Sequence, residues 1–367
     1  MVDARSTVAQ IMGGGTPDRV ALMDRPWKDT LARWVTQGYP TDEKGEPVDP
    51  VEHFDFDLAG VGGWFPWEAR IGASETLEET DEWKLVKNGS GASLRWWKNK
   101  SGTPEHVAFD MSSREIWERD FRPHLVGSAR QRVTEERAGE ALETRQRHTG
   151  AGRWTHFGHM FIWEAMRASL GDISLYENLL LDPGWIRDFC RVYTDLYKEC
   201  FDLLLEEAGR PDGIWIYEDL GYKEATFCSP DVYRELIFPF YAELVDHIHG
   251  HDLPVVLHTC GFEEPVLDMI VEAGFCAVDP MEVKAGNDPL RIAARYRDKL
   301  AFIGGLDVRI LESGDREHIR REVIRLIEGM KSAGARYVYM SDHSISSNVD
   351  LDDFRFSLDV YREHMYY

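Results

Sequence analysis

Two side chains that can bind a metal lie two positions apart where an apolar run ends. Residues 254–257 lead into His258, Thr259, Cys260 and Gly261. A short apolar run bounded by turn signals is typical of a strand that is buried on both faces. On an extended backbone His258 and Cys260 point to the same side, so an imidazole and a thiolate can hold Zn²⁺ from one direction. The alternative is a core histidine beside a buried structural cysteine.

Other polar residues follow apolar runs in the same way. They are Glu218 and Asp219 after residues 213–217, Glu282 after residues 275–278, Asp307 after residues 300–303, and His343 after residues 337–340. If these runs are parallel strands of one barrel, their carboxyl ends converge on one mouth. The four carboxylates are therefore candidate catalytic residues, although each could instead hold a loop in place.

His258, Cys260 and His343 are the predicted zinc ligands. Three protein ligands plus an open position is the pattern of catalytic zinc, and Glu218, Asp219 or a water would take the fourth place. A bound zinc ion lowers the pKa of a coordinated thiol or water and so presents a nucleophile at neutral pH. We expect Asp219 to lie within reach of the metal or its ligands and to stay ionised.

The segment from about residue 151 to the end alternates apolar runs with helical stretches. Amphipathic helices are predicted over residues 230–250, 264–273, 288–296 and 316–333, the last with Asp315 as its cap and Gly334 at its end. This alternation favours parallel βαβ units, and polar strand ends favour a (β/α)8 barrel over residues 150–367 or another parallel α/β sheet. His156 and His159 would lie on the first barrel strand, with a structural role as well supported as a role at the mouth. No G-x-G-x-x-G turn follows a strand, which weakens the case for a dinucleotide-binding sheet.

Residues 1–149 are predicted to form a helical and β-ribbon region that packs on the barrel. The part from 40 to 125 is rich in tryptophan, glycine and acidic residues. Its runs 83–86 and 93–97 flank a turn with Asn88 and Gly89, which favours a hairpin. The charged stretch 126–150 is predicted to be helical. The ribbon could cover the mouth, form a dimer face, or only pack.

The composition limits the classes of partner. The chain has 367 residues, of which 43% are hydrophobic, and a formal net charge of −23. Phosphate backbones and anionic membrane surfaces would repel so acidic a protein, so neither nucleic acid nor a membrane is an expected partner. Five cysteines, no apolar leader and no membrane-length apolar segment predict a cytoplasmic protein without disulfides, with Cys228 and Cys276 used in packing.

Several motifs resemble the uroporphyrinogen decarboxylase superfamily, in the branch that it shares with cobalamin- and coenzyme M-linked methyltransferases. They are EDLG at 218–221, SPDVYRE at 229–235, PFY at 239–241, LHTCG at 257–261, DPME at 279–282 and GGLD at 304–307. The resemblance runs from about residue 150 to the end and implies a (β/α)8 barrel with its site at the C-terminal mouth. In the methyltransferase branch, a His-x-Cys pair and a later cysteine bind zinc, which activates a thiol acceptor for methyl transfer to or from a corrinoid. His258 and Cys260 match that pair.

The later cysteine is the one departure, because His343 stands where the resemblance would place it. Imidazole is also a zinc ligand, but with one thiolate fewer the site suits an oxygen or water ligand better than a thiol acceptor. The decarboxylase branch fits less well. Arg19, Arg25 and Arg33 do not stand in the arginine-rich context that grips substrate carboxylates there, and the chain is acidic.

The resemblance thus implies a zinc-dependent methyltransferase. It would move a methyl group between a small methylated substrate and a corrinoid, free or on a separate carrier protein, or a thiol acceptor. The alternatives are a metal-independent carboxy-lyase that uses Asp219 and arginines, and a non-catalytic barrel that handles a corrinoid. The oligomeric state is open, with a homodimer among the options.

Overall fold

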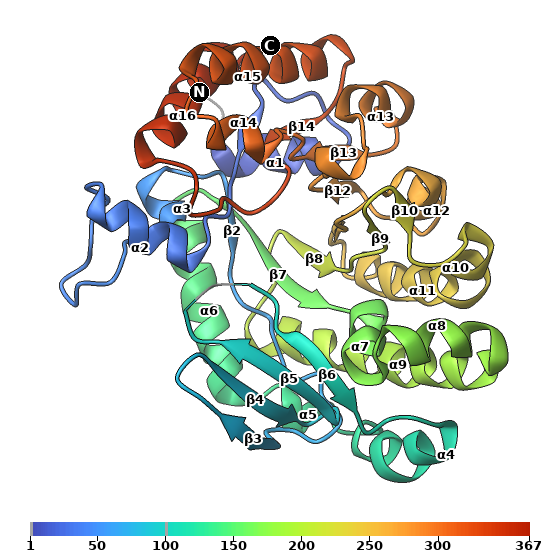
Figure 1. Cartoon of the computed structure of the whole chain (residues 1–367). Helices are drawn as coiled ribbons and strands as arrows, with labels where there is room; N and C mark the ends of the chain where they lie inside the picture. Colours follow the sequence, from blue (N-terminus) through green and yellow to red (C-terminus); the bar gives the residue numbers. More distant parts are fainter. Residues whose placement is uncertain (1–2, 100–101) are drawn as a thin grey trace.

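One curled parallel sheet of eight strands organises the structure, a computed structural model that describes residues 3–99 and 102–367 (Figure 1). The strands follow one another in the order β1-β14-β13-β12-β11-β8-β7-β2, and every neighbouring pair is parallel. They are β1 (Ala21–Leu22), β2 (Leu58–Gly60), β7 (Trp154–Met160), β8 (Gly213–Tyr217), β11 (Val255–His258), β12 (Ala277–Asp279), β13 (Ala301–Ile303) and β14 (Tyr337–Tyr339). Because neighbours in the sheet follow the chain order and β1 returns beside β14, the sheet is a (β/α)8 barrel, as predicted.

Asp57 joins the two edge strands of this sheet, β1 and β2. Its backbone N–H donates to the Leu22 carbonyl at 2.8 Å, and its carboxylate accepts the Leu22 N–H at 2.7 Å. The same carboxylate accepts two hydrogen bonds from the Arg19 guanidinium, each at 2.7 Å. Such a bidentate pair is strong and geometrically specific, so it holds the barrel nearly closed at this point.

Two of the barrel strands, β1 and β2, lie within residues 1–149. The predicted boundary at residue 150 therefore does not separate the barrel from an N-terminal region. The reason is that β1 and β2 contain only two and three residues, too few to show a hydrophobic period in the sequence. As a consequence β7, which carries His156 and His159, is the third barrel strand and not the first.

Large apolar side chains fill the barrel interior, and α1 (Ala4–Met12) closes one end of it. Trp154, Trp215 and Val256 belong to one buried cluster with Ile11 of α1. Arg5 of α1 also forms an ion pair of 2.7 Å with Asp212, just before β8. Helix α1 thus covers the end where the strands begin and leaves the carboxyl-terminal end for function.

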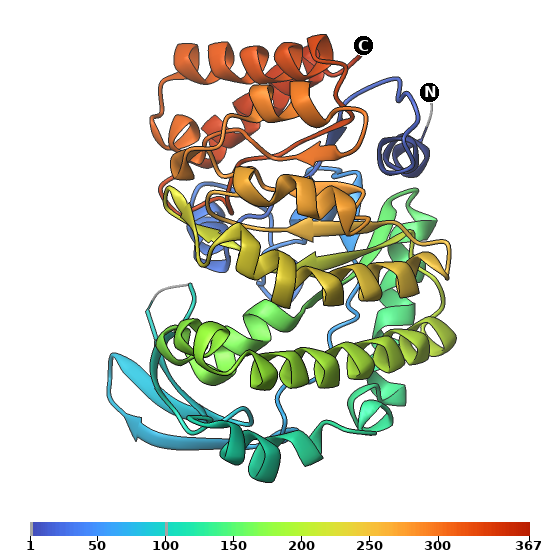
Figure 2. The same cartoon turned by 90° about the vertical axis from the view of Figure 1, so that its right-hand side faces the viewer.

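Helices between the strands form an outer layer (Figures 1 and 2). The helices that follow the later strands agree with the prediction, except that the stretch 230–250 is divided at Ile237 and the stretch 264–273 begins with a 3-10 turn, Glu264–Val266. Asp315 caps α15 through the N–H groups of Glu317 and His318. No helix in the described part of the chain has the length and apolar content that crossing a membrane requires. The helices are α2 (Lys28–Thr36), α3 (Pro50–His53), α6 (Glu135–Gly150), α7 (Ile162–Leu170), α8 (Asp172–Leu181), α9 (Pro183–Glu207), α10 (Pro230–Leu236), α11 (Phe238–His249), α12 (Leu267–Glu272), α13 (Pro289–Tyr296), α14 (Val308–Glu312), α15 (Arg316–Ser332) and α16 (Leu351–His364).

The insertion between β2 and β7 contains the predicted ribbon. It is an antiparallel sheet of β3 (Ser74–Glu79), β4 (Trp83–Asn88), β5 (Ala92–Trp97) and β6 (Glu105–Phe109), followed by α4 (Arg114–Ile116) and α5 (Ala129–Arg132). The predicted hairpin is β4–β5, and the predicted helix over 126–150 is present as α5 and α6. In both views the ribbon lies at the opposite end of the molecule from α15 and α16 (Figures 1 and 2).

We predict that Asp57→Asn destabilises the fold by about 3 kcal/mol, because it leaves the largely buried Arg19 guanidinium, 14% exposed, without its countercharge. Urea denaturation measures this free energy of unfolding. The matched control is Asp81→Asn, because Asp81 is an exposed aspartate of the ribbon, whereas the side chain of Asp57 is only 7% exposed. Equal unfolding free energies for the two variants would contradict the assigned role of the Arg19–Asp57 pair.

Candidate metal centre

His258, the last residue of β11, is held between a buried carboxylate and two potential metal ligands. Its Nδ1 lies 2.6 Å from Asp279 Oδ2. Its Nε2 lies 3.4 Å from Cys260 Sγ and 3.7 Å from Asp219 Oδ1. Because an ionised carboxylate only accepts hydrogen bonds, Nδ1 carries the proton and the Nε2 lone pair faces Cys260 and Asp219.

Asp279, the last residue of β12, is fully buried yet stays ionised. Burial alone would raise the pKa of its carboxyl, but the charge of Arg25 and the hydrogen bond from His258 hold that pKa below its ordinary value. Arg25 follows β1, donates to Asp279 Oδ2 at 3.2 Å, and lies over the rings of Trp215 and Tyr217. One arginine thus spans the barrel mouth and fixes the carboxylate that orients His258.

Cys260 and Asp219 complete the cluster. The Cys260 backbone N–H donates to Asp219 Oδ1 at 3.0 Å, which holds the carboxylate beside the thiol. Burial, followed by the nearby charges of Asp219 and Glu282, raises the pKa of the Cys260 thiol well above its ordinary value. Only a cation at this place would make the thiolate the stable form.

The donor set fits a metal ion of the zinc type. One ligand atom each from Asp219, His258 and Cys260 lie within 4.8 Å of one another. Carboxylate oxygen, imidazole nitrogen and thiolate sulfur are all zinc ligands, and a carboxylate on the far nitrogen of a ligating histidine is the usual support. Within the described residues, the second oxygen of Asp279 and both oxygens of Glu263 are buried without a hydrogen-bond partner. These oxygens near the cluster can therefore still accept hydrogen bonds.

The family model described as uroporphyrinogen decarboxylase (URO-D) matches residues 174–364, more than half of the chain. The chain belongs to the uroporphyrinogen decarboxylase family.

The fold of the chain is also similar to that of one solved structure. A "methyltransferase from Methanosarcina mazei" has the same fold with a TM-score of 0.69 and 14% identity, and the match covers 99% of both chains. An AP endonuclease of family 2 from Brucella melitensis aligns with a TM-score of only 0.30 and 11% identity, over 57% of this chain and 90% of its own, which supports no argument. No curated protein sequence matches the chain.

In this uroporphyrinogen decarboxylase family member, His343 lies outside the group of ligand atoms that are within 4.8 Å of one another. Among the described residues, Asp219 is the residue that lies beside His258 and Cys260, within reach of these ligands as predicted. Ser341, just after β14, donates its hydroxyl to Asp24 at 2.7 Å, and Ile345 N donates to the Arg25 carbonyl at 3.0 Å. These contacts direct the loop along β1, where the His343 ring lies 6.1 Å from that of Trp27.

Glu218 supports a helix and does not face the cluster. Its carboxylate accepts the N–H groups of Phe161 and Trp163 at 2.7 Å each, at the start of α7, and the hydroxyl of Tyr241. Burial raises the pKa of Glu218 to about 8, although the Tyr241 hydroxyl and the N–H donors act in the opposite direction. Glu218 is therefore a helix-positioning residue, in contrast to its prediction as a ligand or catalytic group.

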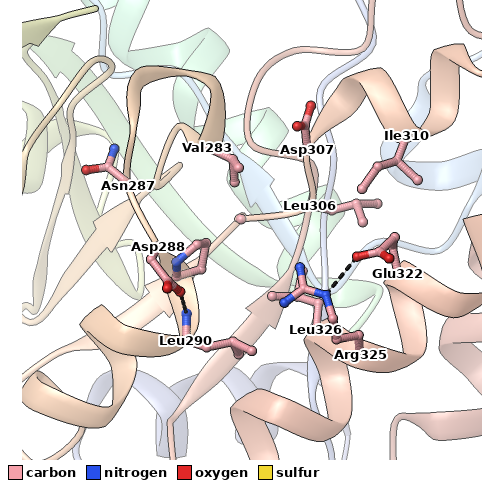
Figure 3. Close-up of a pocket in the computed structure, with 12 residues that line it drawn as sticks. Val283, Asn287, Asp288, Leu290, Leu306, Asp307, Ile310, Glu322, Arg325 and Leu326 are labelled. Carbon is pink, nitrogen blue, oxygen red and sulfur yellow. Dashed lines mark hydrogen bonds and ion pairs between the residues drawn. The ribbon is translucent and has the colours of Figure 1, made fainter. Parts of the chain in front are cut away.

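Glu282 and Asp307 have different surroundings. Glu282 accepts the Gly261 N–H at 2.7 Å and pairs with Lys284 at 3.0 Å, so it supports the loop that carries Cys260. Asp307 caps α14 through the N–H of Arg309 and lines a cavity of about 230 Å³ between α13 and α15 (Figure 3). The lining of that cavity does not include Asp219, His258 or Cys260, so Asp307 lies outside the ligand cluster and its predicted catalytic role stays a prediction.

Three important residues were missed at the sequence level. Asp279 and Arg25 orient His258, and Asp342 ties two loops together by accepting Val283 N at 2.8 Å and Val308 N at 2.9 Å. Asp279 directly follows an apolar run and Asp342 comes one residue after another, and these positions were the signal that could have identified them.

The two histidines of β7 have structural surroundings. His156 lies 4.6 Å from the ring of Trp215, and burial lowers the pKa of its imidazole to about 3. His159 lies against Phe65 and binds the Phe65 carbonyl at 2.9 Å. Neither is in the metal cluster of the described residues.

We predict that Glu218→Gln lowers the free energy of unfolding by about 1–3 kcal/mol. The reason is that the amide has only one acceptor oxygen, whereas the two oxygens of Glu218 accept the N–H groups of Phe161 and Trp163. The same variant should keep the metal content of the wild type, which metal analysis of the purified protein checks. Loss of zinc in Glu218→Gln with an unchanged unfolding curve would return Glu218 to the ligand set.

Proposed function

We propose that the protein is a zinc-dependent methyltransferase of the uroporphyrinogen decarboxylase family. It moves a methyl group between a small methylated substrate and a corrinoid, or a thiol acceptor. The observation that carries the proposal is the direction of His258. Asp279 holds the proton on Nδ1, so that Nε2 faces Cys260 Sγ and Asp219 Oδ1.

Asp219, His258 and Cys260 would hold the zinc ion. When bound there, zinc supplies Lewis acidity, which lowers the pKa of a coordinated thiol or water to near neutrality. The family membership supports an enzyme, and the shared fold of the Methanosarcina mazei methyltransferase is consistent with methyl transfer. A carboxylate in the ligand set, in place of a second thiolate, favours oxygen-type ligands in the open position.

The chain's own residues prepare the site in two ways. Arg25 and Asp279 fix the tautomer and orientation of His258, which removes the cost of ordering that ring during the reaction. On the other side, the ring of Trp64 stacks on Tyr217 at 5.7 Å, and Tyr217 lies 5.5 Å from the ring of His258. This half-exposed aromatic wall provides apolar contact for a small methylated substrate and excludes water beside the ligands.

The direct test combines metal analysis with a cobalamin assay. Purified protein should contain zinc and should change the absorption spectrum of added cob(I)alamin or methylcobalamin when it is given a methylated substrate or a thiol acceptor. The corrinoid is supplied in solution, because the proposal assigns it to a free pool or to a separate carrier protein. Decarboxylation that continues after zinc has been removed by a chelator would favour the carboxy-lyase.

We predict that Cys260→Ser and Asp219→Asn each lose the zinc equivalent of the mouth, whereas His343→Ala keeps it. The reason is that His343 lies outside the group of atoms within 4.8 Å of one another. Metal analysis measures the equivalents, and thermal denaturation confirms that all three variants stay folded. Loss of that zinc in His343→Ala would restore the ligand set predicted from the sequence.

We predict that Asp279→Asn weakens zinc binding by about 10–100-fold, because the amide no longer fixes His258 as a ligand. Competition with a chelating dye measures the affinity. Asp307→Asn is the matched control, since it is also an aspartate at a strand end but lies outside the cluster, and it should keep both zinc and methyl transfer. Unchanged zinc affinity in Asp279→Asn would show that the His258–Asp279 hydrogen bond does not serve the metal.

A further inference from the structure

A second group of ligand side chains lies on the outer helix layer. His247 of α11 and His251, in the turn after α11, both place Nε2 at 2.8 Å from the same atom, Asp202 Oδ1 of α9. One ligand atom from each of these residues lies within 4.8 Å of the other two. All three side chains are partly exposed, so an ion from solution can reach them.

The fold, and not chance contact of loose side chains, holds these groups together. Helices α9 and α11 pack against each other. His247 and His251 are four residues apart, the spacing that puts two side chains on one face of a helical segment. The turn that carries His251 is fixed by hydrogen bonds from its N–H to Ile248 O at 3.0 Å and from the Arg210 guanidinium to its carbonyl.

We propose that Asp202, His247 and His251 form a second divalent-metal site, selective for Zn²⁺ and related borderline ions such as Ni²⁺ and Cu²⁺. Two imidazole nitrogens and a carboxylate oxygen are the ligands that such ions prefer. Tetrahedral bonds of about 2.0–2.1 Å separate ligand atoms by roughly 3.3 Å, so the 2.8 Å contacts need only small side-chain rotations to admit the ion. The acidic chain also attracts cations.

This site is remote from the barrel mouth. His258 ends β11, whereas His251 precedes the start of the same strand at Val255. The two clusters therefore lie toward opposite ends of one strand, and each can bind or lose its ion without the other. Because the ligands come from α9 and α11, the ion would cross-link two helices of the outer layer and stabilise the folded chain, in which alone the three ligands are together.

The test uses the Cys260→Ser background, so that its outcome does not depend on zinc at the mouth. Protein freed of metal with a chelator is titrated with zinc chloride by calorimetry, and its melting temperature is recorded with and without zinc. Cys260→Ser should bind one equivalent of zinc and melt at a higher temperature when zinc is present. Adding His251→Ala should abolish both effects, while adding His249→Ala, a neighbouring exposed histidine outside the cluster, should leave both unchanged.

Two results would overturn the proposal. One is a Cys260→Ser protein that binds no zinc, and the other is a Cys260→Ser/His251→Ala protein that binds as much zinc as Cys260→Ser alone. The difference between wild type and Cys260→Ser reports on the mouth, so failure of the methyltransferase proposal and failure of this one appear in different measurements. Melting temperatures without metal show whether His251→Ala is folded, which keeps the comparison valid.

Discussion

The hydrogen bond between His258 Nδ1 and Asp279 Oδ2 is the contact on which the candidate site depends. A carboxylate as deeply buried as that of Asp279 is stable only if charge and hydrogen bonds compensate its lost hydration. Arg25 provides the charge, and Arg25 is placed by β1, the strand that Asp57 and Arg19 attach to β2. The orientation of the imidazole therefore depends on the buried ion pair of Arg25 and Asp279, and that ion pair depends on the closure of the barrel.

The acidic residues at the strand ends divide into two groups by where their side chains point. Glu218 and Asp342 accept backbone N–H groups and position helices or loops, and Asp307 caps α14. Asp219 instead lies beside Cys260 and His258, with its side chain 38% exposed at the mouth. Acidic residues thus both support the fold and line the candidate site, and the direction of each side chain decides its role.

Much of the barrel follows from the sequence, because runs of apolar residues that end in polar ones mark β8, β11, β12, β13 and β14. The His258–Cys260 pair was also predictable, since alternate residues of a strand share a side. The strands β1 and β2 were not, because they are too short for a pattern. Two features depend on contacts between residues far apart in the chain. Glu218 is held by α7 while Asp219 lies beside Cys260, and the loop of His343 is bound to Asp24, with His343 outside the ligand group.

The central claim is that a zinc ion at the mouth has one sulfur ligand, Cys260, with nitrogen and oxygen as its other protein ligands. X-ray absorption at the zinc edge tests this most directly, on the His251→Ala protein loaded with one equivalent of zinc. The account predicts one sulfur at about 2.3 Å and nitrogen or oxygen neighbours at about 2.0–2.2 Å. A spectrum with no sulfur neighbour, or with two or more, would contradict it.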